Sequence, residues 1–195
     1  MEWLETSALR FAAAIAATLL MTGWIGYSSW HGWRQHAEVA NDFLHYATQL
    51  QRDPAAAREY FVIKYGGQPV DDNVDVERLA YRPTVASGLP PGYTLVASDV
   101  LRMPGCECIG SLCKRDDGSA LAIFEHETEQ PHWFADQPSI QVQCSGQPTQ
   151  NVELGTDRLA ATWPINNRYL TVIGARDIEE VTQLVSNFTT RTGDL

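Results

Sequence analysis

The hydrophobic and polar positions of the chain change their period twice. Residues 11–30 carry no charged side chain, and apolar residues dominate them. After them, apolar side chains recur at steps of three and four up to about residue 66, which is the period of a helix with one buried face. From Tyr93 onward the period is two, which is typical of β-strands. The pattern predicts an apolar segment, then helices, then a sheet.

The uncharged stretch predicts a transmembrane helix over residues 11–30. Its most apolar part, residues 11–27, needs help from its ends to span about 30 Å of hydrocarbon. Arg10 can reach the lipid headgroups. Aromatic rings that suit a membrane interface lie toward the two ends of the segment: Trp3 on one side, and Trp24, Tyr27, Trp30 and Trp33 on the other. Bulky residues after Met21 make a poor cleavage site, so we expect an uncleaved signal anchor. A cleaved signal peptide and a buried soluble helix are the alternatives.

This reading divides the chain into four parts. We expect a short cytoplasmic head (1–10), the anchor (11–30), a helical stalk and connector (31–88) and an extracytoplasmic α+β domain (89–195). The protein would then be a single-pass membrane protein with its C-terminal domain outside the cytoplasm. Its partners would be membrane lipid, an envelope protein and, through the small residues Ala12 and Ala16 on one helix face, a second copy in a homodimer.

Helix signals are sharpest on both sides of the predicted sheet. An apolar stripe follows helical spacing in the stalk: Val39, Phe43, Tyr46 and Leu50. Asp53 followed by Pro54 predicts the start of a second helix, and Gly66-Gly67 predicts its end. Near the C-terminus, Asp177 and Glu180 have the spacing of a capping box. The predicted apolar face of that last helix consists of Ile178, Val181, Leu184, Val185 and Phe188.

Short β-type runs fill the region between these helices. They are residues 93–103, 108–115, 120–126, 139–145, 151–154, 157–164 and 168–174. Asp117-Gly118 is the strongest hairpin signal, because this pair suits turn positions with positive φ. We therefore predict an α+β fold, in which an antiparallel sheet of five to seven strands carries the C-terminal helix on one face, with the helices of residues 34–66 nearby.

Composition and charge narrow the function classes. The chain of 195 residues is 44% hydrophobic and 10% aromatic, as a folded protein should be, and its net charge is −10. A nucleic-acid partner would need a basic face to displace counterions, so we expect none. No Gly-x-Ser-x-Gly elbow or Gly-rich phosphate loop appears, so we expect no enzyme. Glu125, Glu127 and Glu129 are expected on a solvated loop.

The four cysteines leave four interpretations open. Cys106, Cys108 and Cys113 lie close together in sequence, and Cys144 falls in a later strand with its side chain expected toward the core. An even number in an exported domain favours structural disulfides. Thiolates also select Cu(I) or Zn(II), with His126 or His132 as a further ligand, although Cys-x-Cys is not the usual zinc knuckle. A thiol-redox switch and inert buried thiols are the other two interpretations. We expect no cofactor apart from such a metal.

Trp133 and Phe134 are candidates for contact with a partner. Aromatic side chains dominate binding hot spots, so these adjacent rings could anchor another protein. Packing in the core is the competing explanation for the same two rings.

Two further motifs resemble those of a known family. They are Leu89-Pro90-Pro91-Gly92-Tyr93-Thr94-Leu95-Val96 and Asp117-Gly118-Ser119-Ala120-Leu121-Ala122-Ile123-Phe124. Together with a preceding helix, they resemble the extracytoplasmic part of bacterial single-pass anti-sigma-factor-type regulators, over about residues 34–126. The resemblance implies a regulatory outer domain. Those regulators carry a cytoplasmic sigma-binding domain before the membrane helix, whereas only residues 1–10 precede it here, so the resemblance supports the outer domain alone.

The sequence thus supports two hypotheses. The first is a membrane-anchored, non-enzymatic sensory or protein-interaction module outside the cytoplasm. The second is a copper- or zinc-binding, or thiol-redox, accessory protein of the cell envelope, which would use the cysteines.

Overall fold

The computed structural model describes residues 37–70, 83–127, 133–134, 137–155 and 157–192. The chain divides into residues 1–38 and a compact unit of residues 39–195. The predicted head and transmembrane segment lie outside the described residues. Within the described ranges, no helix is both long and apolar enough to cross a membrane.

The compact unit is α+β, as predicted. It begins with a helix whose described part is residues 37–50. The other elements are α2 (Pro54–Lys64), β1 (Gln68–Pro69), the 3₁₀ helix η1 (Thr84–Ser87), β2 (Tyr93–Met103), β3 (Cys106–Arg115), β4 (Ala120–His126), β5 (Ser139–Cys144), β6 (Gln147–Glu153), β7 (Leu159–Ile165), β8 (Arg168–Ala175) and α4 (Ile178–Thr192). The strands from β2 onward correspond to the seven period-two runs of the sequence, although β6 begins four residues before the predicted run 151–154.

The strands form one antiparallel sheet in the order β1-β2-β3-β4-β8-β7-β6-β5. Strands β2 to β4 form one meander and β5 to β8 a second, and the two meet where β4 pairs with β8. The sheet has eight strands, so the prediction of five to seven was wrong. The extra strand is β1, which pairs Gln68 with Val100 and Pro69 with Asp99. A strand of two residues is too short to show any periodicity.

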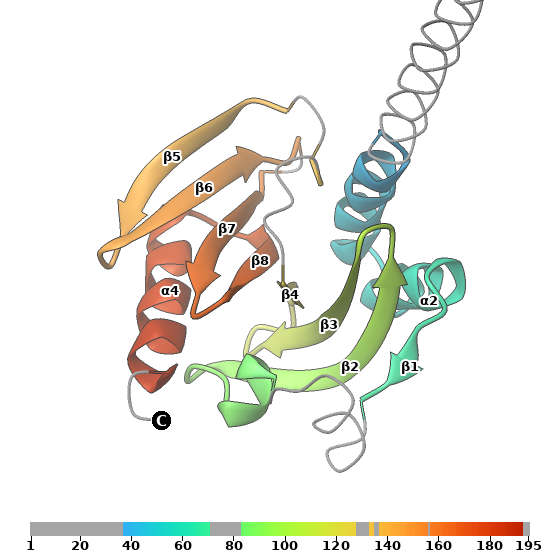
Figure 1. Cartoon of the computed structure of the whole chain (residues 1–195), viewed down its shortest axis with the longest axis horizontal. Helices are drawn as coiled ribbons and strands as arrows, with labels where there is room; N and C mark the ends of the chain where they lie inside the picture. Colours follow the sequence, from blue (N-terminus) through green and yellow to red (C-terminus); the bar gives the residue numbers. More distant parts are fainter. Residues whose placement is uncertain (1–36, 71–82, 128–132, 135–136, 156, 193–195) are drawn as a thin grey trace, which may run out of the picture. The chain divides into compact units, whose positions relative to one another are not determined.

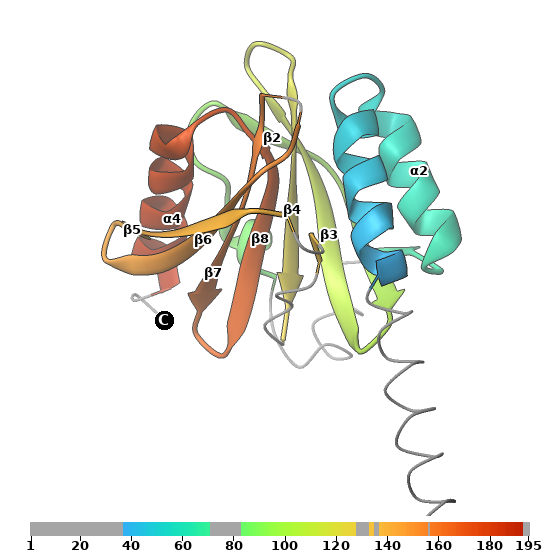
Figure 2. The same cartoon turned by 90° about the horizontal axis from the view of Figure 1, so that it is seen from above.

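Helices cover both faces of the sheet (Figures 1 and 2). The helix of residues 37–50 and α2 cover one face, and the predicted stripe of Val39, Phe43, Tyr46 and Leu50 is buried there. The start of α2 is also confirmed, since the Asp53 carboxylate accepts a bond of 3.0 Å from the Ala56 N–H. Residues 39–65 therefore belong to the core of the compact unit and do not form a separate stalk.

Helix α4 covers the opposite face, as predicted. Its residues Val181, Leu184, Val185 and Phe188 are fully buried against the sheet. Asp177 caps the helix by accepting a bond of 2.8 Å from the N–H of Glu180. A capping box would also have the Glu180 carboxylate accept from the N–H of Asp177. It accepts instead from the N–H of Arg176.

Two glycines with positive φ differ in how much space surrounds them. Both have positive φ, +91° at Gly174 and +80° at Gly146. A Cβ atom at Gly174 would lie 2.9 Å from Gln51 Nε2 and 3.3 Å from Leu50 Cδ2, whereas one at Gly146 would meet nothing within 4 Å. We expect Gly146→Ala to lower the free energy of unfolding by about 1–2 kcal/mol through strain alone. Gly174→Ala should lower it further, because the buried Leu50 side chain must shift, whereas the flexible end of Gln51 can turn aside at little cost.

Urea denaturation of the two variants would measure both costs. Equal losses would mean that Leu50 does not pack against Gly174 as closely as the structure has it.

Candidate functional site

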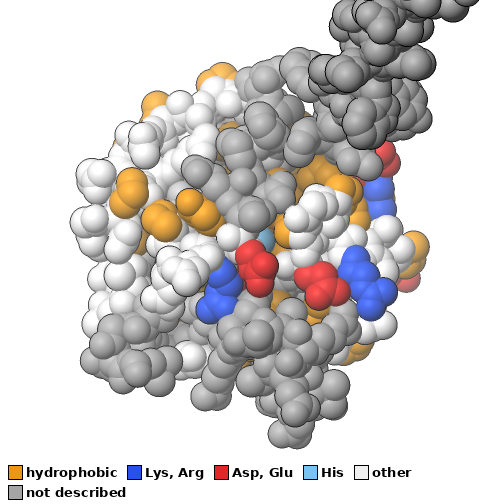
Figure 3. Space-filling model, viewed as in Figure 1, with side chains coloured by type: hydrophobic (Ala, Val, Ile, Leu, Met, Phe, Trp, Pro, Cys, Tyr) orange, Lys and Arg blue, Asp and Glu red, His pale blue; other side chains and the backbone are white. Residues whose placement is uncertain are grey.

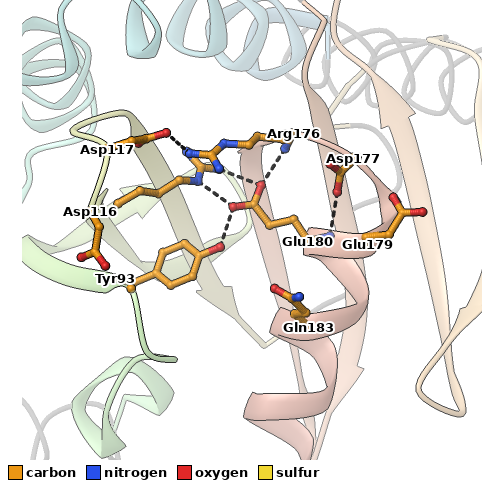
Figure 4. A pocket seen from close by; sticks show the side chains of 10 residues that line it. Tyr93, Asp116, Asp117, Arg176, Asp177, Glu179, Glu180 and Gln183 are labelled. Carbon is orange, nitrogen blue, oxygen red and sulfur yellow. Dashed lines mark hydrogen bonds and ion pairs between the residues drawn. The ribbon is translucent and has the colours of Figure 1, made fainter.

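A polar cleft lies where three segments far apart in sequence meet. The start of β2, the β3–β4 hairpin and the junction of β8 with α4 enclose a cleft of about 440 Å³ (Figure 4). Its lining includes Tyr93, Arg115, Asp117, Arg176, Asp177 and Glu180. The two family-like motifs adjoin here, since the Asp116 N–H donates to the Gly92 carbonyl at 3.1 Å. Eight of the cleft's ten lining residues have ionisable side chains.

Arg115 at the end of β3 is buried, with 5% of its surface exposed. Its Nε donates to Glu180 Oε1 at 2.6 Å, and its Nη2 donates to Glu180 Oε2 at 2.9 Å and to the Gly174 carbonyl at 2.8 Å. Its Nη1 donates to the Ala120 carbonyl at 2.7 Å and to Ser119 Oγ at 3.2 Å. A guanidinium has five N–H groups, so every donor of Arg115 is used.

Glu180 in the first turn of α4 is the counterpart of Arg115 and is equally engaged. Its Oε1 also accepts from the Tyr93 hydroxyl, and its Oε2 accepts from the Arg176 N–H at 2.7 Å. Each carboxylate oxygen therefore receives two hydrogen bonds, which is its full capacity. Burial alone would raise the pKa of Glu180, but the bonds from Arg115, Tyr93 and Arg176 outweigh burial and lower it. Burial and the bond to Glu180 raise the pKa of Tyr93 to about 12.

This saturation decides what the cleft can do chemically. A general acid or base needs a lone pair or proton that can reach a substrate. Arg115 and Glu180 have none to spare, so their pairing is structural. The rim is acidic: Arg176 pairs with Asp117, which also accepts from Ser119 N at 2.9 Å, while Asp116 and Glu179 are exposed (Figure 4). On the face shown in Figure 3, basic and acidic side chains lie next to each other, and the described surface carries no continuous basic patch.

The other buried acids of the described chain are engaged in the same way. Asp42 accepts from the Tyr60 hydroxyl at 2.6 Å and pairs with Lys64 at 2.7 Å, which joins the helix of residues 37–50 to α2. Asp99 on β2 receives two bonds of 2.6 Å from Arg58 on α2. These acids hold helices to the sheet and to each other.

Glu125 overturns an expectation. It is not on a solvated loop but in β4, with 2% of its surface exposed. It accepts from the Thr84 N–H at 2.7 Å and the Thr84 hydroxyl at 3.0 Å, and it pairs with Arg168 at 3.1 Å. Burial raises its pKa more than these contacts lower it. Glu125 therefore attaches η1 to the sheet, a role that required the long-range contact with residue 84.

The sheet separates the four cysteines. Cys106 and Cys108 lie on the face covered by α2, whereas Cys113 and Cys144 lie in the core under α4. The reason is alternation along β3, because positions 108 and 113 differ by an odd number and so point to opposite faces. Cys144 points to the core, as predicted. None of the four is joined to another by a disulfide, and no described group of three His, Cys, Asp or Glu side chains is placed to hold a metal ion.

The surroundings of these thiols oppose reactivity. Burial raises the pKa of Cys108 well above its ordinary value and that of Cys113 to about 12, and a thiol is nucleophilic only as the thiolate. His126 lies opposite Cys108 in the register of β3 and β4. Its Nε2 is 3.0 Å from the Thr171 hydroxyl, and its ring lies 4.2 Å from that of Trp133. His132 lies outside the described residues.

Trp133 and Phe134 are core residues in the structure. Trp133 is 2% exposed and stacks on Phe43 at 4.4 Å, and Phe134 is 6% exposed with its ring 5.9 Å from the same phenylalanine. The interpretation of these rings as an exposed partner contact therefore gives way to packing. The large apolar side chains that are exposed among the described residues are Ile63, Leu95, Val96 and Ile140.

No family model matches this chain, and no curated protein or solved structure matches it significantly. The resemblance to anti-sigma-factor-type regulators therefore continues to depend on the two sequence motifs.

The Arg115–Glu180 pair is expected to be a major determinant of stability. Glu180→Gln leaves the guanidinium buried without its counter-charge and should lower the free energy of unfolding by about 3 kcal/mol. The matched control is Glu107→Gln, which removes the charge from an exposed pair with Arg102 at 3.4 Å and should cost less than about 1 kcal/mol. Chemical denaturation of both variants measures the difference.

The pH dependence of stability provides a second readout of the same pair. Because the folded pKa of Glu180 lies below the ordinary 4.5, its contribution is complete above about pH 4.5 and is lost as the pH falls through the folded pKa. Glu180→Gln should therefore flatten the acid limb of the stability curve. A variant with the wild-type acid limb would show that this pair is not coupled to folding.

Thiol accessibility is expected to follow burial. In the native protein Cys106, which is half-buried, should react with a thiol reagent first, and Cys108, Cys113 and Cys144 should be protected because all three are buried. Unfolding in denaturant should expose all four. Fewer than four titratable thiols after unfolding, without added reductant, would reveal a disulfide that the structure does not contain.

Proposed function

We propose that this chain is a membrane-anchored, non-enzymatic module that faces the outside of the cytoplasm and contacts another protein of the cell envelope. The observation that carries the non-enzymatic part of the proposal is the saturation of the cleft. Every donor of Arg115 and every acceptor position of Glu180 is used within the domain, which is expected of a structural clamp and not of a catalytic pair.

The connection between the uncharged stretch and the compact unit is short. The uncharged stretch ends at Trp30, and the compact unit begins at Val39, so only residues 31–38 separate them. Such a short connection would keep the domain close to the bilayer. An interaction module in this position would meet partners in, or next to, the same membrane.

The soft-metal or thiol-redox alternative receives less support. Its ligand set would need Cys106, Cys108 and Cys113 to converge, but β3 places Cys113 on the face opposite to the other two. The pairing of Cys108 with His126 across β3 and β4 is what remains in its favour.

Membrane attachment and orientation can be tested together in the full chain. We expect the protein to remain in the membrane fraction after alkaline washing, and a reporter fused after Leu195 to be active only outside the cytoplasm. Leu19→Arg, which places a charge in the uncharged stretch, should release the protein from the membrane. Ile63→Arg is the control, because Ile63 is 74% exposed and its substitution should change nothing.

A reporter that works only in the cytoplasm would refute the proposed orientation. Recovery of the intact wild-type chain in the soluble fraction would refute the anchor.

A further inference from the structure

One edge of the sheet is open. Among the described strands, β5 is the last strand of the sheet and pairs with β6 alone (Figure 1). The opposite edge is blunt, because β1 has two residues and one of them is Pro69. An unpaired edge strand presents a row of backbone N–H and C=O groups that can accept another strand. Among the described elements, none pairs with the outer side of β5.

The turn between β5 and β6 shows which backbone groups point outward. Ser145 and Gly146 form a two-residue loop with φ of +48° and +80°, as in a type I′ turn. Such a turn is closed by a doubly hydrogen-bonded pair, here Cys144 with Gln147, and bonded pairs then alternate along the ladder. The backbone groups of Ile140 and Val142 are therefore directed to β6.

The backbone groups of Ser139, Gln141 and Gln143 point the other way, to the open side. Pro148 agrees with this alternation of bonded and non-bonded pairs. It lies opposite Gln143 in a non-bonded pair, where β5 needs no hydrogen bond from a backbone N–H that proline lacks. The outward row thus consists of alternate residues that leave the β5–β6 ladder undisturbed.

The usual protection of an edge strand is missing from β5. Natural sheets discourage edge pairing with charged residues, prolines or bulges. Strand β5 reads Ser-Ile-Gln-Val-Gln-Cys, and residues 137–152 contain no Asp, Glu, Lys or Arg, in a chain with 24 acidic and 14 basic residues. Ile140 on this strand is 67% exposed.

We propose that β5 pairs with β5 of a second copy of this chain, antiparallel about a two-fold axis at Gln141. In this register Gln141 lies opposite its own copy, Ser139 lies opposite Gln143, and Ile140 lies opposite Val142. The outward backbone groups then face each other, and each bonded pair exchanges two hydrogen bonds. The apolar side chains meet on one face and the polar side chains on the other, which covers Ile140.

Among the described strands, electrostatics favours a second copy at this edge. Two chains with a net charge of −10 repel each other over most of their surfaces. Residues 137–152 carry no charge, so two copies can approach there with little repulsion. A C₂ dimer also requires a self-complementary surface, which the register about Gln141 provides. The proposal concerns the domain and does not depend on the membrane anchor.

Charge substitutions at the axis test this proposal in the full chain, purified in detergent micelles. The dimer should be visible by sedimentation velocity in the wild type. Gln141→Lys or Gln141→Glu alone places like charges opposite each other and should raise the dimer Kd by at least about tenfold. An equimolar mixture of the two variants should restore a dimer, because opposite charges then meet.

The matched control is Gln150→Lys. Gln150 lies directly opposite Gln141 in the ladder but one strand further in, so its substitution adds the same charge to the same face away from the axis. This variant should still dimerise. Site-resolved hydrogen exchange should show slow exchange at the outward amides of Gln141 and Gln143 in the wild type and fast exchange in Gln141→Lys, with Ile140 and Val142 protected in both.

A monomeric wild type, or a dimer that both charge variants leave intact, would overturn the proposal. In the second case dimerisation would use another surface, such as the residues before Val39. Failure of the mixture to restore the dimer would equally reject the register about Gln141.

Discussion

The buried ion pair between Arg115 and Glu180 is the contact on which the arrangement of this domain depends. It links the end of β3 to the first turn of α4, and the same guanidinium binds the carbonyl groups of Ala120 and Gly174. Tyr93 adds the start of β2 to the network. Charges buried in this way are favourable only when every polar atom has a partner. The network therefore requires five elements, β2, β3, β4, β8 and α4, to be in place together, and it fixes the position of α4 on the sheet.

Because helices cover both faces of the sheet, most of the candidate ligand and contact residues of the sequence are buried. Alternation along β3 divides the cysteines between two separate cores. Trp133 closes the aromatic cluster around Phe43 on one of these faces and stacks against it. Glu125 faces the other core and holds η1 there. Side chains that suggest ligands or contacts in the sequence become parts of the packing once both faces are covered.

The buried polar groups of the described domain hold its own segments together. The buried acids serve as internal anchors, the described thiols are mostly protected, and the cleft at α4 has an acidic rim around a saturated centre. Residues 137–152, which include β5 and most of β6, carry no charge, and β5 ends the described sheet without protection. A domain with these properties is suited to association through its surface, and an unprotected edge strand can supply such an interface.

The local sequence pattern predicted most of the helices and strands of this fold. The period of two marked β2 to β8, the stripe of Val39 and Phe43 marked the first helix, and Asp53 and Asp177 marked helix starts, because these signals depend on neighbours within a few residues. Strand β1 was missed because two residues carry no period. The order of the strands, the partners of Arg115 and Glu125, and the faces taken by the cysteines depended on contacts between distant segments. Only the assembled sheet could set them, since burial and hydrogen bonding at each position are determined by what packs against it.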